Sequence, residues 1–364
     1  MSTTAEIKRG ISAYFETGEE GDAALVVESG LDALPALREY LLEDRPIDET
    51  ERLESLLKRV LGGVMKGRVS PGAARRVAEF QQQLGFILKY KSYAIKAASP
   101  LGYSIFLQQP REGFSFQRHL THKTEVFHIL EVAPGGFVFL CSSEDWEQHY
   151  EQETFERWLG GEPHPFFDRR RFAPSPGDVF VISELGVVHT VVGCVLEEFA
   201  TVSTDMVDRL HDQNAGRPTP SEFTRSYAEA RLAAIPTPTR HRLLSPRVEP
   251  PEITAIAPVP VRGGERWVLT DSFVTATHTV LHPGAEGPLE SPAGKAVCAR
   301  VFEGEGQVLI AAGPDRETGT GQPVPVSAGD LLMFPPGVYH GFRNGRDRAF
   351  RYSEHGIAPE VAFY

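Results

Sequence analysis

The sequence predicts a mainly β protein with an N-terminal helical region. Apolar residues recur at spacings of three and four up to about residue 97, and the period changes to two from Tyr103 onward. The chain also contains 34 Gly and 28 Pro, which suit many short strands joined by turns. Its 364 residues suggest more than one domain, because a single hydrophobic core stops growing at about 250–300 residues.

Composition excludes several classes of protein. The net charge of −12 opposes binding to a phosphate backbone, so we expect no nucleic-acid partner. The sequence has no secretory signal and no apolar run of about 18 residues, so we expect no membrane partner and a cytoplasmic protein. Cys141, Cys194 and Cys298 are an odd and widely spaced set, which argues against a disulfide framework.

The first predicted region, residues 1–98, is helical. Leu34–Leu42, Glu51–Leu61 and Pro71–Leu88 carry apolar residues at helical spacing. Pro71 follows Ser70, and proline suits the first turn of a helix.

The second predicted region, residues 99–215, is built of strands. Short period-two runs alternate with turns rich in Gly, Pro and Asp, which is typical of an antiparallel sandwich or barrel. The runs are Tyr103–Leu107, Glu125–Leu130, Phe137–Leu140, Val179–Ile182 and Val195–Val202.

A polar insertion, Ser142–Phe172, interrupts these strands. It carries Trp146, Trp158 and the basic run Arg169–Arg171. We weigh two interpretations equally: a lid over the barrel that contributes to substrate binding, and a surface excursion whose tryptophans pack on the barrel exterior.

Residues 216–262 read as a connector, with a helix at Ser221–Ala234 followed by a run of prolines. Residues 263–364 then repeat the strand pattern and form a second predicted β domain. Its strands are expected at Arg266–Leu281, Lys295–Phe302, Gln307–Ala311 and Leu331–Phe334.

One segment of this last region carries a specific motif. The stretch Gly329–Asn344 resembles the second signature of the cupin superfamily, G(x)5PxG(x)2H(x)3N, and places His340 at its histidine. A looser copy runs from Gly177 to His189, with Glu184 in the place of the proline. The resemblance implies a bicupin, that is, two cupin (double-stranded β-helix, or jelly-roll) barrels.

The partner signature, G(x)5HxH(x)3–4E(x)6G, aligns with Gly113, His119 and Glu125, with Thr121 where the second histidine belongs. The resemblance implies that His119, Glu125 and His189 bind a metal ion. On a regular strand residues 119, 121 and 125 share one face, and His122 points away. A bulge or a turn before the strand would re-aim His122, which is therefore kept as a fourth candidate ligand.

The second copy of this signature has lost its ligands. Ser291, Ala293 and Val297 stand where the metal-binding residues belong. We therefore expect a degenerate second barrel that binds no metal, with His340 packed or hydrogen-bonded in the barrel mouth.

Two histidines and a carboxylate with open positions are typical of non-haem Fe(II) oxygenases. We therefore predict a metal-dependent oxygenase acting on a small polar or anionic molecule. Fe(II) is the expected metal, and Mn, Ni and Zn also suit these ligands. Thr121 and Glu184 are the candidate catalytic residues.

Two alternatives stay open. A sugar or sugar-phosphate isomerase or epimerase would use Mn or Zn, with Glu184 or His122 as the base. Residues 196–212 resemble the tail of sugar-acting cupins and favour it. The other alternative is a non-catalytic bicupin that binds or stores a small molecule. A homodimer is compatible with each of these functions.

Overall fold

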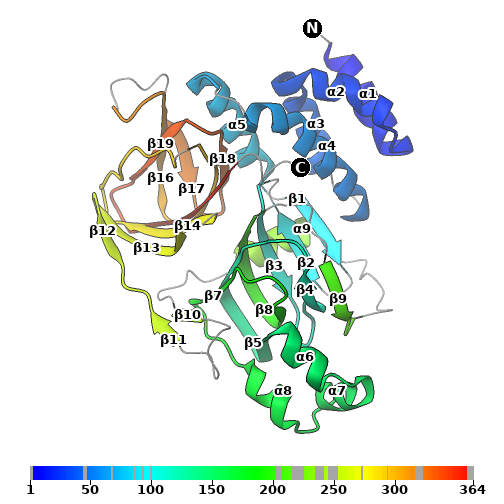
Figure 1. The fold of residues 1–364 in the computed structure, drawn as a ribbon. Helices are drawn as coiled ribbons and strands as arrows, with labels where there is room; N and C mark the ends of the chain where they lie inside the picture. The colour runs from blue at the N-terminus through cyan, green and yellow to red at the C-terminus, as the bar shows by residue number, and fades with distance from the viewer. Residues whose placement is uncertain are drawn as a thin grey trace.

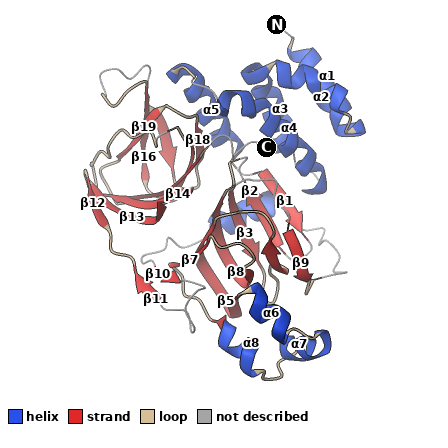
Figure 2. Ribbon diagram, in the orientation of Figure 1, coloured by secondary structure: helices blue, strands red, loops and turns tan. Residues whose placement is uncertain are grey.

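The computed structural model describes residues 3–43, 47–66, 69–85, 87–91, 94–98, 101–201, 207–214, 225–233, 242–244, 253–271, 274–292, 294–315 and 323–358. Helices of the N-terminal region lie beside two β barrels that follow one another along the chain (Figure 1). Figure 2 shows the strands gathered in the two barrels, with further helices at the far end of the first barrel. The predicted fold class is confirmed.

The first and the last helix of the N-terminal region begin at side-chain caps. In the first helix the Thr3 hydroxyl accepts from the Glu6 amide, while the Glu6 carboxylate accepts from the Thr3 amide. Ser70 caps the last helix by accepting from the Ala73 amide. The helices are α1 (Thr4–Thr17), α2 (Glu20–Glu28), the 3-10 helix η1 (Gly30–Ala33), α3 (Leu34–Leu42), α4 (Ile47–Lys66) and α5 (Pro71–Leu84).

The helical prediction is wrong after Leu84. There α5 ends, Gly85 follows with a φ of 65°, and the chain forms β1 (Ile87–Lys91) and β2 (Ala94–Ala98). A glycine commonly ends a helix because no Cβ opposes a positive φ. The β1 strand pairs with β2, and β2 pairs with the first strand of the first barrel, so the two strands extend its sheet.

The strands of the first barrel include those predicted. They are β3 (Tyr103–Gln108), β4 (Phe116–His119), β5 (Glu125–Cys141), β6 (Arg171–Phe172), β7 (Asp178–Ile182), β8 (Val188–Ala200) and β9 (Val207–His211). Along the main path of the sheet the order is β1-β2-β3-β8-β5-β7, and β4 pairs with both β8 and β9. The two strands predicted at residues 125–130 and 137–140 are one long strand, which pairs with β8 on both sides of a bulge between Val132 and Phe137.

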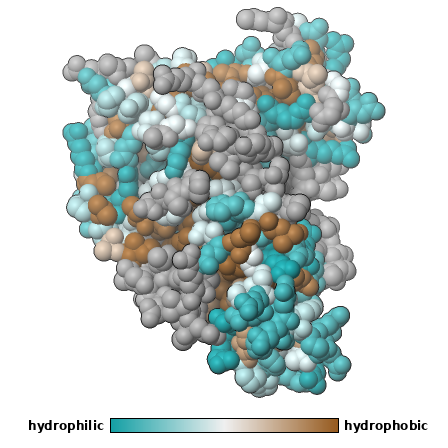
Figure 3. All heavy atoms as spheres, in the orientation of Figure 1, coloured by the Kyte–Doolittle hydropathy of each residue, from teal (hydrophilic) through white to brown (hydrophobic). Residues whose placement is uncertain are grey.

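The insertion after β5 is helical rather than a loop, with α6 (Ser143–His149), α7 (Gln152–Leu159) and α8 (Pro165–Arg170). Its tryptophans, Trp146 and Trp158, are buried in a cluster with Phe116 and Phe139 of the barrel. Phe139 alternates along β5 with residues of the barrel interior, so this cluster lies on the outer face. The structure therefore supports packing on the exterior over a lid. The outward sides of these helices are mostly hydrophilic (Figure 3).

Two sheets form the second barrel. Their orders in the described residues are β12-β13-β14-β20-β15-β18 and β17-β16-β19, and both contribute to one apolar cluster. The strands are β12 (Val259–Val261), β13 (Gly264–Asp271), β14 (Val274–Leu281), β15 (Ala296–Glu303), β16 (Glu305–Ala311), β17 (Val324–Ser327), β18 (Leu331–Phe334), β19 (Tyr339–Asn344) and β20 (Phe350–Ile357).

Much of the predicted connector, residues 215–224, 234–241 and 245–252, lies outside the described residues. Its described parts are α9 (Arg225–Ala233), β10 (Arg242–Leu244) and β11 (Ile253–Ala255), and β10 pairs in parallel with β7. In the described part of the chain, no helix combines the length and apolarity needed to cross a membrane.

The two barrels and the N-terminal helices share one hydrophobic core. At its centre Glu197 of β8 accepts hydrogen bonds from the Tyr103 hydroxyl at 2.5 Å and from the Ser353 hydroxyl at 2.9 Å. The Nδ1 atom of His128 lies 2.9 Å from the other oxygen of Glu197. Because Ser353 belongs to β20, this buried network joins the first barrel to the second.

Candidate metal centre

Three strand ends bring the predicted ligands together. His119 is the last residue of β4, Glu125 is the first of β5, and His189 is the second of β8. Gln117 lies opposite His189 in the sheet. The amide of Gly186, in the turn before β8, donates to the carbonyl of His119 at 3.3 Å. The backbone therefore fixes the spacing of the two histidine-bearing strand ends.

The turn before β8 requires a glycine at position 186. Its φ is 75°, and a Cβ there would lie 3.0 Å from the hydroxyl oxygen of Ser143. That hydroxyl donates to the Gly186 carbonyl, so the start of α6 holds the turn in place. The insertion thus supports the strand that carries His189.

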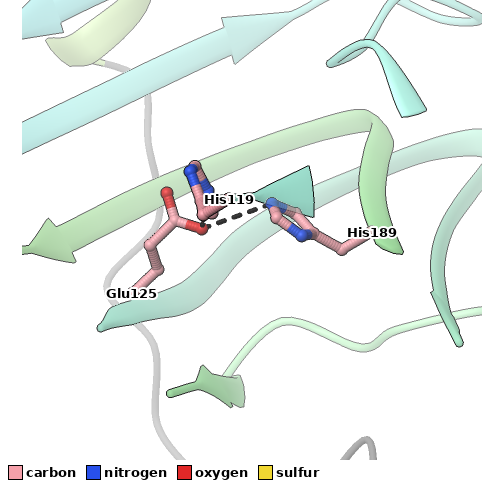
Figure 4. A group of neighbouring side chains, drawn as sticks. All are labelled: His119, Glu125 and His189. Atoms are coloured by element: carbon pink, nitrogen blue, oxygen red, sulfur yellow. Dashed lines mark hydrogen bonds and ion pairs between the residues drawn. The ribbon is translucent and has the colours of Figure 1, made fainter. Parts of the chain in front are cut away.

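The side chains of the three residues converge on one point (Figure 4). The Oε2 atom of Glu125 lies 3.1 Å from Nε2 of His119 and 3.3 Å from Nε2 of His189. The two imidazole rings stack with centroids 5.2 Å apart. All three side chains are buried, so their polar atoms face one another inside the barrel.

The ring of His189 is oriented by the backbone. Its Nδ1 atom lies 3.0 Å from the carbonyl of Val187 and donates to it, which leaves Nε2 as the ring nitrogen that faces Glu125. An imidazole whose other nitrogen donates to a carbonyl is the usual form of a metal-binding histidine. The ring also packs 6.1 Å from Phe127 of the barrel interior.

Lys123 keeps the carboxylate ionised. Its ammonium lies 2.7 Å from the Oε1 atom of Glu125 and 3.7 Å from Glu198. Burial raises the pKa of Glu125, but Lys123 and the two imidazoles outweigh it, and the pKa lies well below its usual value. The two carboxylate oxygens of Glu125 therefore have different partners: Oε1 contacts Lys123, and Oε2 faces the two histidines. The sequence signal for this arrangement was the two-residue spacing between Lys123 and Glu125.

The donor atoms fit a divalent first-row metal. One ligand atom from each residue lies within 4.8 Å of the other two. Metal bonds of about 2.0–2.2 Å place neighbouring donors roughly 3.0–3.5 Å apart in octahedral or tetrahedral geometry. The separations of 3.1 and 3.3 Å from the carboxylate oxygen to the histidine nitrogens fall in that range. Neutral imidazole and ionised carboxylate are also the forms that bind a metal.

The remaining predicted site residues do not belong to this group of ligand atoms. Of the two conformations considered for residues 119–125, the structure has a turn before the strand, because residues 120–124 form a loop between β4 and β5. That loop exposes His122 and leaves Thr121 half-buried. Glu184 is half-buried in the turn before β8. The group of three ligand atoms contains none of them.

In the second barrel the signature histidine has protein partners. His340 is buried, stacks on Phe334 at 4.0 Å and places Nε2 2.9 Å from Oε1 of Glu354. At the positions of the lost ligands, Ser291 is half-buried and Val297 is buried in the apolar core. The third position, Ala293, lies outside the described residues.

A guanidinium supplies positive charge beside His340. Arg266 lies 2.7 Å from Glu290 and 3.8 Å from Glu354, and its Nε donates to the hydroxyl of Thr279 at 3.2 Å. Burial raises the pKa of Glu354, but His340 and Arg266 together lower it by more. The pKa of Glu354 therefore lies below its usual value. The half-buried carboxylate of Glu354 thus lies beside both an imidazole and a guanidinium. Neither Arg266 nor Glu354 was predicted from the sequence, because the sequence does not show which distant residue a charged side chain in a strand will contact.

Comparison with known proteins places the second barrel in a family. Residues 277–354 match the family model described as a cupin domain, which confirms the predicted resemblance over that range. The match covers one of the two β barrels that follow one another along the chain. A search among curated proteins finds no match.

Several solved structures are distantly similar. Oxalate decarboxylase from Lactobacillus farciminis, in a formate complex, is 12% identical, with a TM-score of 0.44 over 75% of this chain and 84% of that chain. Oxalate decarboxylase from Bacillus subtilis is 11% identical, with a TM-score of 0.44 over 75% and 74%. An 11S globulin from Wrightia tinctoria is 13% identical, with a TM-score of 0.43 over 74% and 81%. Likenesses this distant say nothing about function.

Proposed function

We propose that the first barrel holds one divalent metal ion and that the protein is a non-haem Fe(II) oxygenase. The observation that carries the proposal is the buried group of His119, Glu125 and His189, a two-histidine, one-carboxylate set. Three protein ligands leave coordination positions open, which is the arrangement of non-haem Fe(II) oxygenases. When bound, Fe(II) would supply redox chemistry and positions for dioxygen and substrate.

The chain's own residues prepare this centre. Val187 fixes the tautomer of His189 through its carbonyl, and Lys123 holds the carboxylate of Glu125 in its ionised form. Phe127 excludes water from one side of the His189 ring. The ammonium of Lys123 also provides a positive charge beside the ligands, which favours a small polar or anionic substrate.

The isomerase alternative receives no support from the geometry. Its candidate bases were His122, which is exposed in the loop between β4 and β5, and Glu184, which is half-buried in the turn before β8; neither belongs to the group of His119, Glu125 and His189. The predicted homodimer and the cytoplasmic location stay predictions.

Anaerobic loading with Fe(II), followed by elemental analysis and by EPR with nitric oxide as a probe for open iron positions, tests the proposal. We expect one iron per chain and a high-spin iron–nitric oxide signal. His119→Ala and His189→Ala should lose both, whereas His122→Ala, which removes an exposed histidine three residues from a ligand, should keep both. Iron binding without a nitric oxide signal, or equal loss in His122→Ala, would refute the proposal.

A further inference from the structure

A second candidate site lies outside the first barrel. A cleft of about 700 Å³ is formed between the C-terminal end of α7 and the bend of β5. Its volume is that of a typical small-molecule pocket, about 300–1,000 Å³. Its apolar wall, Phe137, Trp158 and Val192, belongs to the aromatic cluster on the outer face, whereas His189 packs against Phe127 of the inner cluster. The barrel wall therefore separates this cleft from the candidate metal centre.

The charge of the cleft is opposite to that of the chain. Arg111 and Arg171 both line it, and in the described part of the chain neither forms an ion pair with a carboxylate. Glu156 is the acidic side chain of the lining, and its Oε1 accepts a hydrogen bond from Gln152. Two guanidiniums and one carboxylate give the cleft a net positive charge in a protein of net charge −12. Such a local excess attracts anions.

One guanidinium is already oriented for recognition. The Arg171 guanidinium lies over the ring of Phe137, 4.4 Å from its centroid. Stacking on an aromatic face leaves the edge N–H groups of an arginine available to a carboxylate in a bidentate pair. The adjoining wall is also fixed, since the indole N–H of Trp158 donates to Asp168 at 2.9 Å.

The second arginine of the lining, Arg111, has an unfavourable backbone conformation. Arg111 has a φ of 68° and is the sole non-glycine residue with a positive φ in the described part of the chain. It sits in a turn closed by a 3.0 Å hydrogen bond from the Glu112 amide to the Gln109 carbonyl. A left-handed residue in a turn favours glycine, and another residue there costs about 1 kcal/mol. Turn formation alone therefore does not explain an arginine at this position.

The remaining polar groups of the lining are neutral. His211 is half-buried, and burial lowers its pKa, so its ring is uncharged near neutral pH. Gln213 adds an amide beside it. We propose that this cleft binds a small organic anion with a flat apolar body, such as an aromatic carboxylate. The carboxylate would lie between Arg111 and Arg171, and the apolar body against Trp158 and Val192.

The test uses 2-naphthoate as the probe and 2-naphthamide as its uncharged counterpart, with binding measured by isothermal titration calorimetry. We expect saturable binding of naphthoate to the full chain and binding at least roughly tenfold weaker for the amide, because charge-assisted hydrogen bonds are lost. Arg171→Gln should weaken naphthoate binding by at least roughly tenfold. Arg157→Gln, which removes an exposed arginine of α7 outside the lining, should leave it unchanged.

Arg111→Gly separates binding from folding. Glycine suits the positive φ, so this variant should keep the melting temperature while losing naphthoate affinity. His189→Ala should bind naphthoate normally, which makes the result independent of the proposed metal function. The proposal is overturned if there is no saturable binding at millimolar concentration, if naphthoate and naphthamide bind equally, if the arginine variants bind normally, or if binding is lost in His189→Ala.

Discussion

Two buried histidines at the contact between the barrels should make the protein sensitive to acid. His278 and His355 are 1% and 0% exposed, and burial lowers the pKa of each from 6.5 to about 3. His128 and Arg351 add repulsion on His278, and Lys295 adds repulsion on His355. Both rings therefore stay neutral in the folded protein under conditions where they bind a proton in the unfolded chain.

The sign and size of the effect follow from this difference. Between pH 6.5 and about 3 the unfolded state binds more protons, so the free energy of unfolding falls as the pH is lowered. At about pH 5 each histidine is 1.5 units below its unfolded pKa, which corresponds to about 2 kcal/mol, or about 4 kcal/mol for the two. This loss is a large part of a typical stability of about 5–15 kcal/mol.

Urea unfolding of chelator-treated protein, from about pH 7.5 to pH 5, measures the loss. His278→Gln and His355→Gln each remove one titrating group, so each should reduce the pH-dependent change by about 2 kcal/mol whatever its effect on absolute stability. His122→Gln removes an exposed histidine and serves as the control. The reasoning is refuted if the wild-type stability is flat over this range, or if the control variant reduces the change as much as the two buried ones.

Three further predictions concern the barrels and the insertion. His189→Ala should lose metal by at least roughly 100-fold in affinity, while His340→Ala should keep it, as measured by elemental analysis and metal-dependent thermal shift; equal losses would show that the second barrel also binds metal. Arg266→Met should lower the free energy of unfolding by about 1–3 kcal/mol, because the half-buried Glu354 keeps His340 but loses its guanidinium, whereas Arg343→Met, which breaks an exposed pair with Glu286, should cost less than about 1 kcal/mol. Phe155→Ala should cost about 3–5 kcal/mol and expose α6 to α8 to proteolysis, since Phe155 is fully buried in the outer cluster; protection equal to wild type would count against that cluster as the anchor.

The sequence predicted those elements whose patterns are local. The α3 helix has the predicted bounds, and the strands β3 and β7 differ from prediction by one residue. The candidate ligand group was predictable from motif register, because the signature that the sequence resembles indicates which strand ends carry His119, Glu125 and His189. The exposure of His122 was not predictable, because it depends on where β4 ends and β5 begins rather than on residue spacing.

Other features depend on contacts that no local pattern contains. The helices α6 to α8 are six to eight residues long, too short to be stable alone, and they form because Trp146, Phe155 and Trp158 pack onto the barrel. The strands β1 and β2 carry few apolar residues in alternation; β2 is held by pairing with β3, and β1 by pairing with β2. Likewise, the partnership of Arg266 with Glu354 joins residues that are distant in sequence.

These long-range contacts give the second barrel a structural role in the fold. Glu197 and His189 lie on the same strand, β8, which runs from the candidate metal centre to the contact between the barrels. At that contact Glu197 bonds to Ser353 of the second barrel, and this bond restrains the strand at the end away from His189. An arginine, unlike a metal ion, cannot dissociate, so the pairing of Arg266 with Glu354 gives the second barrel a permanent internal cation. The second barrel can therefore hold β8 in place whether or not metal is bound in the first.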